Sequence, residues 1–228
     1  MTFLVCLVTV FPLGMPEVLV NRPAPKLLTG RNLQTALKQV VEVRWQKADL
    51  RYIVNQISTQ LKVGIVLDRR IDPSPKPSIS LKNITLKKGL ETIAGKVNAR
   101  ALAVGNTMFF IPAPKLDSLK SQLLKREAEW IRMRKTIPIR RRFELELSKT
   151  LHWNDLDEPR KIVLGIAKRY RVSISGAKKI PHDLWASATM PRATLRQQLT
   201  TVLFQYDLEF QWSKRGDSIE IVPITKMK

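Results

Sequence analysis

The segment IVNQISTQLKVGIVLDRRI, residues 53–71, returns in altered form as IVLGIAKRYRVSISGAKKI, residues 162–180. The shift between the two copies is 109 positions, from residue 53 to residue 162. Apolar residues keep the same spacing in both copies, which predicts that the same faces are buried in the same order twice. The coinciding residues are Ile53, Val54, Ile57, Val63, Ile65 and Ile71 on Ile162, Val163, Ile166, Val172, Ile174 and Ile180.

The repeat extends outward on both sides of this segment, so that residues 41–114 align with residues 150–225. Small shifts in the alignment fall between elements, where loops accept extra residues. Because the match covers most of each half, the sequence predicts one domain in each half. The outer matches are Trp45 with Trp153, Thr85, Leu86 and Leu90 with Thr194, Leu195 and Leu199, Gly105 with Gly216, and Pro112 with Pro223.

Within the first half, the apolar spacing predicts the order β-α-β-β-α-β-β. A strand is expected over 41–45, a helix after the N-cap Asp49, strands over 63–67 and 78–81, a helix after the cap Thr85, and a hairpin over 99–111. In the second half, Phe143, Leu145 and Leu147 alternate as a strand would. Helices are expected there near 158–170 and 194–206, with a final hairpin turning at 214–217. The fold class is therefore α+β, with two helices on one face of a small sheet in each domain.

The predicted organisation has four parts. Residues 1–30 form an export signal and N-terminal arm, residues 31–114 the first domain, residues 115–142 a basic helical linker that Pro138 ends, and residues 143–228 the second domain. In residues 1–30, the apolar run from Thr2 to Pro12 has the length of a secretory signal core. No Lys or Arg precedes it and no clear Ala-x-Ala site follows, so an apolar arm packed on the fold is the alternative.

Charge is the main compositional feature of the chain. It has 40 Lys and Arg against 19 Asp and Glu, a formal charge of +21. Such an excess attracts polyanions, whether nucleic acid, anionic lipid, acidic wall polymer or an acidic protein. The linker is the densest positive stretch, and we expect an anionic partner to contact its basic residues, which are Lys125, Arg126, Arg132, Arg134, Lys135, Arg140, Arg141 and Arg142.

Signals of catalysis and of cofactor binding are weak. Neither histidine, His152 or His182, has a neighbour that suggests acid–base chemistry, and the acidic residues at 155–158 suit a helix start better than a metal site. The single cysteine, Cys6, precludes a multi-thiolate metal site, and no phosphate-binding glycine loop occurs. Trp45 and Trp153 recur at equivalent positions and are read as core. We expect a chain that is not an enzyme, with no cofactor, no metal and no small-molecule substrate.

One sequence pattern, present in both halves, resembles the STN domain, the short N-terminal domain of secretins and TonB-dependent receptors. It comprises a strand, a helix of the form D-L-x-x-I-V-x-x-I, the strand V-G-I-V-L-D (Val63 to Asp68), another strand, the capped helix T-L-x-x-G-L-x-x-I (Thr85 to Ile93) and a hairpin ending near Pro112. The second half differs from this pattern, because it has Glu158-Pro159 where the first half has Asp49-Leu50. The resemblance implies a docking role toward other proteins in the bacterial envelope and carries over no catalytic residue.

The leading functional hypothesis is therefore a periplasmic or envelope protein that binds a protein partner, with anionic lipid or wall polymer as further partners. The alternative is a cytoplasmic protein that binds nucleic acid through the basic linker. A hydrolase with an unrecognised site is the third class.

Overall fold

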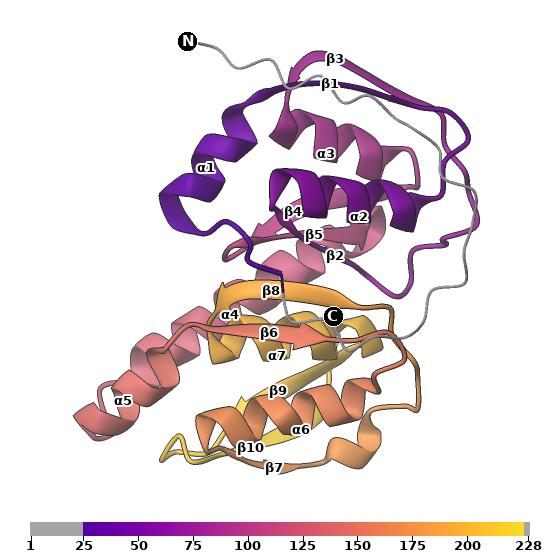
Figure 1. Cartoon of the computed structure of the whole chain (residues 1–228). Helices are drawn as coiled ribbons and strands as arrows, with labels where there is room; N and C mark the ends of the chain where they lie inside the picture. Colours follow the sequence, from indigo (N-terminus) through magenta and orange to yellow (C-terminus); the bar gives the residue numbers. More distant parts are fainter. Residues whose placement is uncertain (1–24, 226–228) are drawn as a thin grey trace.

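The computed structural model describes residues 25–225, so the apolar run at 2–12 and the predicted export signal lie almost entirely outside the described residues. The described chain is a mixed α+β fold, as predicted. We call residues 40–112 the first module and residues 149–223 the second module, since both contain strand, helix, strand, strand, helix and hairpin in the same order (Figure 1).

The first module has strands β1 (Val40–Trp45), β2 (Gly64–Leu67), β3 (Ile79–Thr85), β4 (Ala99–Val104) and β5 (Thr107–Pro112), with helices α2 (Leu50–Leu61) and α3 (Leu86–Gly95). The second module has β6 (Lys149–Trp153), β7 (Ser173–Ser175), β8 (Ala188–Ala193), β9 (Leu208–Trp212) and β10 (Ser218–Pro223), with α6 (Pro159–Tyr170) and α7 (Leu195–Leu203). Outside the modules lie α1 (Gly30–Lys38), α4 (Leu116–Met133) and α5 (Ile139–Glu146). Short 3-10 turns occur at Ala113–Lys115, Ala177–Lys179 and Phe204–Tyr206.

Each module contains two sheets, where the sequence predicted one. In the first module β1 pairs antiparallel with β3, while β5 pairs with β2 in parallel and with β4 antiparallel. The second module repeats this with β6–β8 and with β7–β10–β9. The helices lie between the two sheets and are covered on both sides (Figure 1). Apolar spacing marks buried faces but does not say which strands pair, so it could not separate one sheet from two.

Backbone conformation repeats along with topology. Lys62 and Arg171 end α2 and α6 in the left-handed region, with φ of 54° and 52°. Gly105 and Gly216 occupy the hairpin turns with φ of 61° and 67°, a conformation that glycine adopts without steric cost. The remaining equivalent positive-φ residues are Lys47 with Leu156, Asn83 with Arg192, and Asn98 with Asp207.

Helix starts follow the predicted caps. The Asp49 side chain accepts hydrogen bonds from the backbone N–H groups of Arg51 and Tyr52, and Thr85 caps α3 by accepting from Lys88 N–H. In the second module Thr194 and Gln197 form a reciprocal capping box at α7. Glu158 makes no side-chain cap bond at α6, which begins instead with Pro159 at a position where the missing N–H costs nothing.

The two modules are stacked on one another. From top to bottom, Figure 1 shows β1–β3, the first helix pair, β2–β5–β4, β6–β8, the second helix pair and β7–β10–β9. β5 is buried on both faces: Met108 and Phe110 belong to the core of the first module, whereas Phe109 and Ile111 belong to the core of the second. At Gly64 the contact is close enough that an added Cβ would lie 2.8 Å from Pro191 Cδ.

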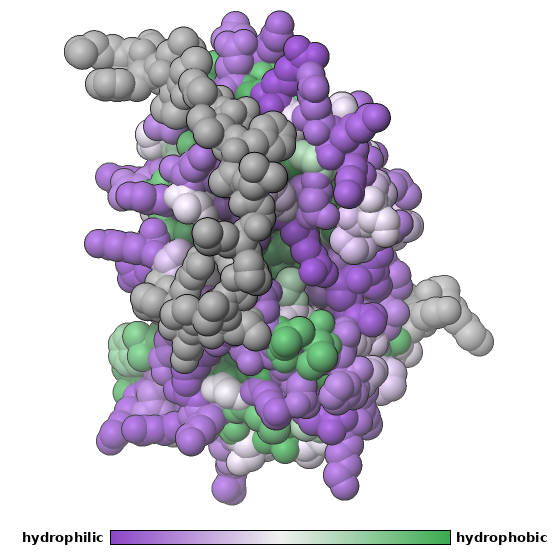
Figure 2. Space-filling model, turned by 45° about the vertical axis from the view of Figure 1, so that its right-hand side comes forward, coloured by the Kyte–Doolittle hydropathy of each residue, from purple (hydrophilic) through white to green (hydrophobic). Residues whose placement is uncertain are grey.

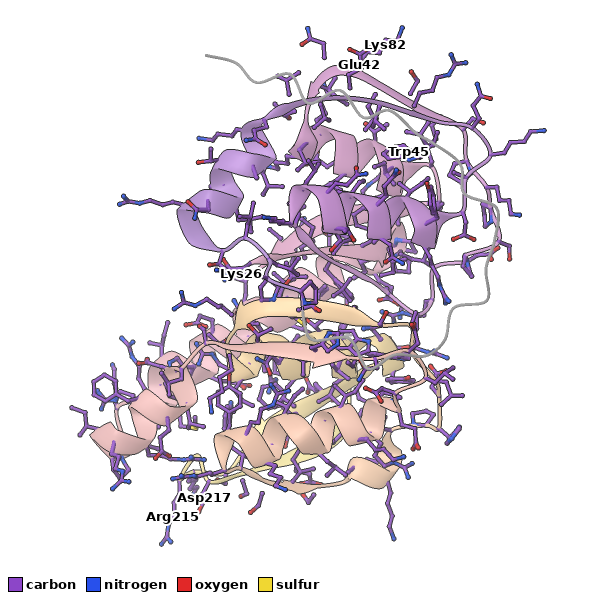
Figure 3. The ribbon with its side chains drawn as sticks, viewed as in Figure 1. Lys26, Glu42, Trp45, Lys82, Arg215 and Asp217 are labelled. Atoms are coloured by element: carbon purple, nitrogen blue, oxygen red, sulfur yellow. The ribbon has the colours of Figure 1, made fainter. Side chains whose placement is uncertain are left out.

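The outer faces of the stack differ from the junction in their residue types. Phe109 is fully buried, while Glu220 at the equivalent position of β10 is exposed. At the other end, Glu42 and Lys82 stand on the outer face of β1–β3 (Figure 3), and both are exposed. Trp45, on the same strand as Glu42, points inward and is buried, as predicted for both Trp45 and Trp153. The surface in Figure 2 is mainly hydrophilic, with hydrophobic residues in separate groups.

Outside the modules, one predicted element is wrong and one helix was not predicted. Residues 143–147 were expected to form a strand, but Phe143 and Leu145 lie in α5 and Leu147 follows it. Only Leu145 is buried, while Phe143 and Leu147 are 62% and 55% exposed, so the alternation does not mark a buried face. Helix α1 was not predicted either. Its Leu33 and Leu37 join the core of the first module.

Candidate binding groove on the linker helix

The predicted linker is a packed part of the fold. Helix α4 lies beside α7, with Leu119 and Trp130 buried in the second module's core. Arg196 of α7 pairs with Glu127 of α4 at 3.1 Å, and its guanidinium lies 4.7 Å from the centre of the Trp130 ring. The eight basic residues of the linker therefore have fixed and very different environments.

Arg126 is buried, with only 2% of its side chain exposed, so it is not available to the partner predicted for it. Its guanidinium pairs with Glu129 at 2.8 Å and with Glu209 at 3.3 Å, and it donates to the backbone carbonyl of Phe210. Burial lowers the pKa of Arg126, although both carboxylates oppose that effect. Burial also raises the pKa of Glu129, against the influence of Arg126. This arginine joins α4 to strand β9.

Three other linker cations are bound to protein groups as well. Arg141 donates to the carbonyls of Tyr170, Arg171 and Gly216 and pairs with Glu144 at 3.0 Å, so it ties α5 to the end of α6 and to the last hairpin. Hydrogen bonding to Arg141 is the main cause that lowers the pKa of Glu144. Arg140, 88% exposed, and Arg134, 47% exposed, make looser pairs at 3.8 Å and 3.9 Å. Their charged ends remain accessible.

Lys125, Arg132, Lys135 and Arg142 complete the predicted set. Lys125 binds Glu209 at 2.9 Å and is still 46% exposed. Arg132 and Lys135 are exposed and make no ion pair with other residues of the 25–225 range. Arg142 is half-buried, and its Nε has no hydrogen-bond partner in that range. Lys125 and Arg132 therefore lie near one surface of α4, whereas Arg140 and Arg142 lie on the separate helix α5.

A groove of about 700 Å³ lies between the C-terminal half of α4 and strand β9. Three basic residues, Lys125, Arg132 and Lys214, line it, with Glu129 as the acidic residue. Because Glu129 is already paired with buried Arg126, the groove carries an excess of positive charge. Its other lining residues are Met133, Thr136, Gln211, Trp212 and Ser213.

Strand β9 is the edge of its sheet, since β10 is its only partner in the sheet. Two backbone hydrogen bonds, from Ser213 N–H to Ser218 O and from Ile224 N–H to Asp207 O, fix the pattern of this hairpin. They show that the backbone N–H and C=O groups of odd-numbered residues of β9 point toward β10. By the alternation of antiparallel pairs, the backbone N–H and C=O of Trp212 then point to the open side. The indole Nε1–H of Trp212 is buried and has no acceptor among the described residues. The groove thus combines cations, an apolar side chain and the open-side backbone groups of Trp212.

Sequence reasoning did not identify Trp212 and Lys214 as site residues. They lie about 80 positions from Arg132 along the chain, in the last hairpin, and only the packing of α4 against β9 brings them together. A tryptophan beside a basic turn was the one available signal, and a core position explains such a tryptophan equally well.

The remaining candidate residues from the sequence are the two histidines and the acidic residues at 155–158, and most of them make hydrogen bonds within the fold. His152 is half-buried and bonds Thr189 Oγ1 at 2.8 Å, while His182 is exposed. Asp157 accepts from the backbone N–H of Asn154, and Asp155 accepts from that of Ser187. Among residues 25–225, no group of His, Cys, Asp and Glu side chains is arranged to hold a metal ion. In the same residues no helix is both long and apolar enough to cross a membrane.

No model of a known protein family matches the sequence, and no curated protein matches it either.

Proposed function

We propose that this chain is a non-enzymatic docking protein of the bacterial envelope, built from two STN-like modules, that binds an extended acidic segment of a protein partner in the α4–β9 groove. The observation that carries the proposal is the groove itself, which three basic residues line together with Trp212 on the edge strand β9. The repeated β-α-β-β-α-β-β order supports the STN likeness.

The groove suits an extended peptide for two reasons. On the open edge of β9 the Phe210 carbonyl is already occupied by Arg126, but the backbone N–H and C=O of Trp212 can pair with a peptide backbone, and the neighbouring side chains then select what that peptide carries. Lys125, Arg132 and Lys214 favour carboxylates in a partner, while Met133 and Trp212 offer apolar contact to the side chains between them. A partner with alternating acidic and apolar residues matches both.

Nucleic acid is the competing ligand, because the same cations attract phosphates. Arg140 and Arg142 on α5 strengthen that attraction without belonging to the groove. A phosphate backbone, however, can accept from the N–H groups of the β9 edge but has no donor for its C=O groups, whereas a peptide backbone can pair with both. Binding that depends on the groove residues therefore supports the peptide-binding function. Binding that depends only on total charge supports the nucleic-acid function.

The binding test uses a fluorescein-labelled peptide of alternating Glu and Val residues, measured by fluorescence anisotropy at two salt concentrations. Arg132→Glu combined with Lys214→Glu should weaken binding at least tenfold, whereas Lys87→Glu combined with Lys88→Glu, an equal charge change on the exposed side of α3, should change it less than threefold. Trp212→Ala, which removes the apolar surface that the indole ring gives the groove, should weaken binding several-fold.

Two results would contradict the proposal. One is equal weakening by the groove and α3 variants, which would mean that only net charge matters. The other is tighter binding of a single-stranded oligodeoxynucleotide of the same length, which would favour the nucleic-acid function.

Export is tested separately by fusing residues 1–30 to a reporter that is active only outside the cytoplasm. We expect the fusion to be active, because residues 2–12 have the length and apolarity of a signal core. An inactive, cytoplasmic fusion would remove the envelope location and leave the groove measurement standing on its own.

A further inference from the structure

A second cavity lies at the junction of the two modules, away from the α4–β9 groove. It has a volume of about 340 Å³ and is lined by residues of both modules. The first module contributes the start of α2, strand β2 and the loop after it, and the second contributes Trp153 and the loop around Trp185. Pockets that bind small molecules fall in this size range and occur preferentially at such interfaces.

The walls of this cleft are held by a network that crosses the junction. Arg69 of the first module pairs with Asp183 of the second at 2.7 Å. The same carboxylate oxygen accepts from Tyr206 Oη at 2.8 Å and from Trp185 Nε1 at 3.2 Å. Trp185 also stacks on Tyr206, with ring centres 6.0 Å apart and planes at 6°. The negative charge of Asp183 is therefore compensated by Arg69, and the Trp185 ring is held in place.

Two charged side chains on the cleft remain available to a ligand. Arg51, at the start of α2, is exposed and makes no side-chain ion pair within residues 25–225. Asp155, on the opposite module, is exposed and uses one oxygen to accept from Ser187 N–H at 2.8 Å. The cleft thus offers one cation from the first module and one anion from the second, and Trp153, Leu184 and Trp185 also line it.

We propose that this cleft binds a small zwitterion with an apolar side chain, of amino-acid or dipeptide size. The ligand carboxylate pairs with Arg51, its ammonium group pairs with Asp155, and its side chain lies against the tryptophans. A simple anion or a simple cation satisfies only one of the two protein charges, and a neutral apolar molecule satisfies neither. This site is independent of the α4–β9 groove, and it departs from the expectation that the chain has only macromolecular partners.

The experiment uses the full chain and follows tryptophan fluorescence and binding heat during titration with L-phenylalanine and with the dipeptide L-alanyl-L-phenylalanine. The two probes distinguish a free amino acid from a longer zwitterion. N-acetyl-L-phenylalanine lacks the ammonium charge and L-phenylalaninamide lacks the carboxylate, and each should bind about tenfold more weakly than L-phenylalanine or its dipeptide.

Protein variants assign each charge. Arg51→Gln should remove the preference for the acid over the amide and leave the preference for the free amine unchanged. Asp155→Asn, which keeps an oxygen to accept from Ser187, should do the reverse. The control is Arg44→Gln, an exposed change on β1 outside the cleft, which should bind as the original chain does.

The proposal is overturned if neither zwitterion binds at millimolar concentration, or if the acetylated and amidated compounds bind as tightly as the parent. Thermal melting of each variant shows whether it is folded, and neither Arg51 nor Asp155 is buried in the core. Failure here leaves peptide binding at the α4–β9 groove untouched, because the two sites share no lining residue.

Discussion

Arg126 and Glu209 are opposite charges enclosed between α4 and β9, with 2% and 5% of their side chains exposed. A buried charge is strongly destabilising once its partner is removed. The pair therefore stabilises this particular packing of α4 against β9. Glu209→Gln should lower the free energy of unfolding by about 3 kcal/mol, as measured by urea denaturation.

The control for this residue is Glu220→Gln, since the Glu220 side chain is 58% exposed and pairs with Lys179 at 3.7 Å. Its effect should stay within about 0.5 kcal/mol. Equal effects of the two variants would show that the Arg126 pair is not a structural requirement.

Glycine at position 64 is needed for close approach of the modules. A Cβ there would lie 2.8 Å from Pro191 Cδ and 3.2 Å from Thr189 O, so Gly64→Ala should cost about 1–3 kcal/mol by overpacking. Gly165, in the middle of α6, has no atom within 4 Å of an added Cβ, and Gly165→Ala should instead stabilise by about 1 kcal/mol. Opposite shifts in melting temperature check both statements.

Helices and hairpins with strong local sequence signals were predicted well. α2 and α3 begin after their predicted caps, and hairpins form over the predicted 99–111 and with a turn in the predicted 214–217. The stretch 143–147 was mispredicted because its alternation is accidental, and pairing of Glu144 with Arg140 and Arg141 favours a helix there. The α4–β9 groove was half predicted: its basic residues on α4 are local in sequence, whereas Trp212 and Lys214 arrive only through tertiary packing.

Strand β5 serves two cores at once, and this can be tested by paired truncations. Phe109→Ala and Phe110→Ala each remove a fully buried ring and should each cost about 3–5 kcal/mol. Their local effects should differ, because Phe109 belongs to the second module's core and Phe110 to the first module's. Amide hydrogen exchange should rise in β6 and β8 for Phe109→Ala and in α2 and α3 for Phe110→Ala. The same exchange pattern in both variants would contradict this division.

Acid should weaken the junction between the two modules. Burial acts to raise the pKa of Asp183, but hydrogen bonds from Tyr206 and Arg69 outweigh it and hold that pKa below its ordinary value. Asp207, which pairs with Lys115 and Arg70, shows the same balance, and its pKa is also lowered. A carboxyl whose pKa is lowered in the folded state stabilises fully above the unfolded value of about 3.9, and that contribution is lost as the pH falls through the folded value.

The midpoint of urea unfolding should therefore fall as the pH is lowered from 5 toward 2.5. Asp183→Asn should flatten this dependence, because the variant has no carboxyl to protonate and has already lost the ion pair with Arg69. A variant whose midpoint still falls as steeply as that of the original chain would mean that other groups control acid unfolding.

Stacking the modules in the same orientation gives the molecule two unlike ends, one formed by β1–β3 and the other by β7–β10–β9 (Figure 1). At the second end, the hairpin tip bears Arg215 and Asp217 (Figure 3), and Glu220 occupies the place that Phe109 holds at the junction. Exposed charge on such a terminal surface disfavours the head-to-tail addition of further copies, which the geometry by itself would not oppose. Any redesign of these sheets should therefore keep this charge, because an apolar residue at Glu220 would make the end resemble the buried junction.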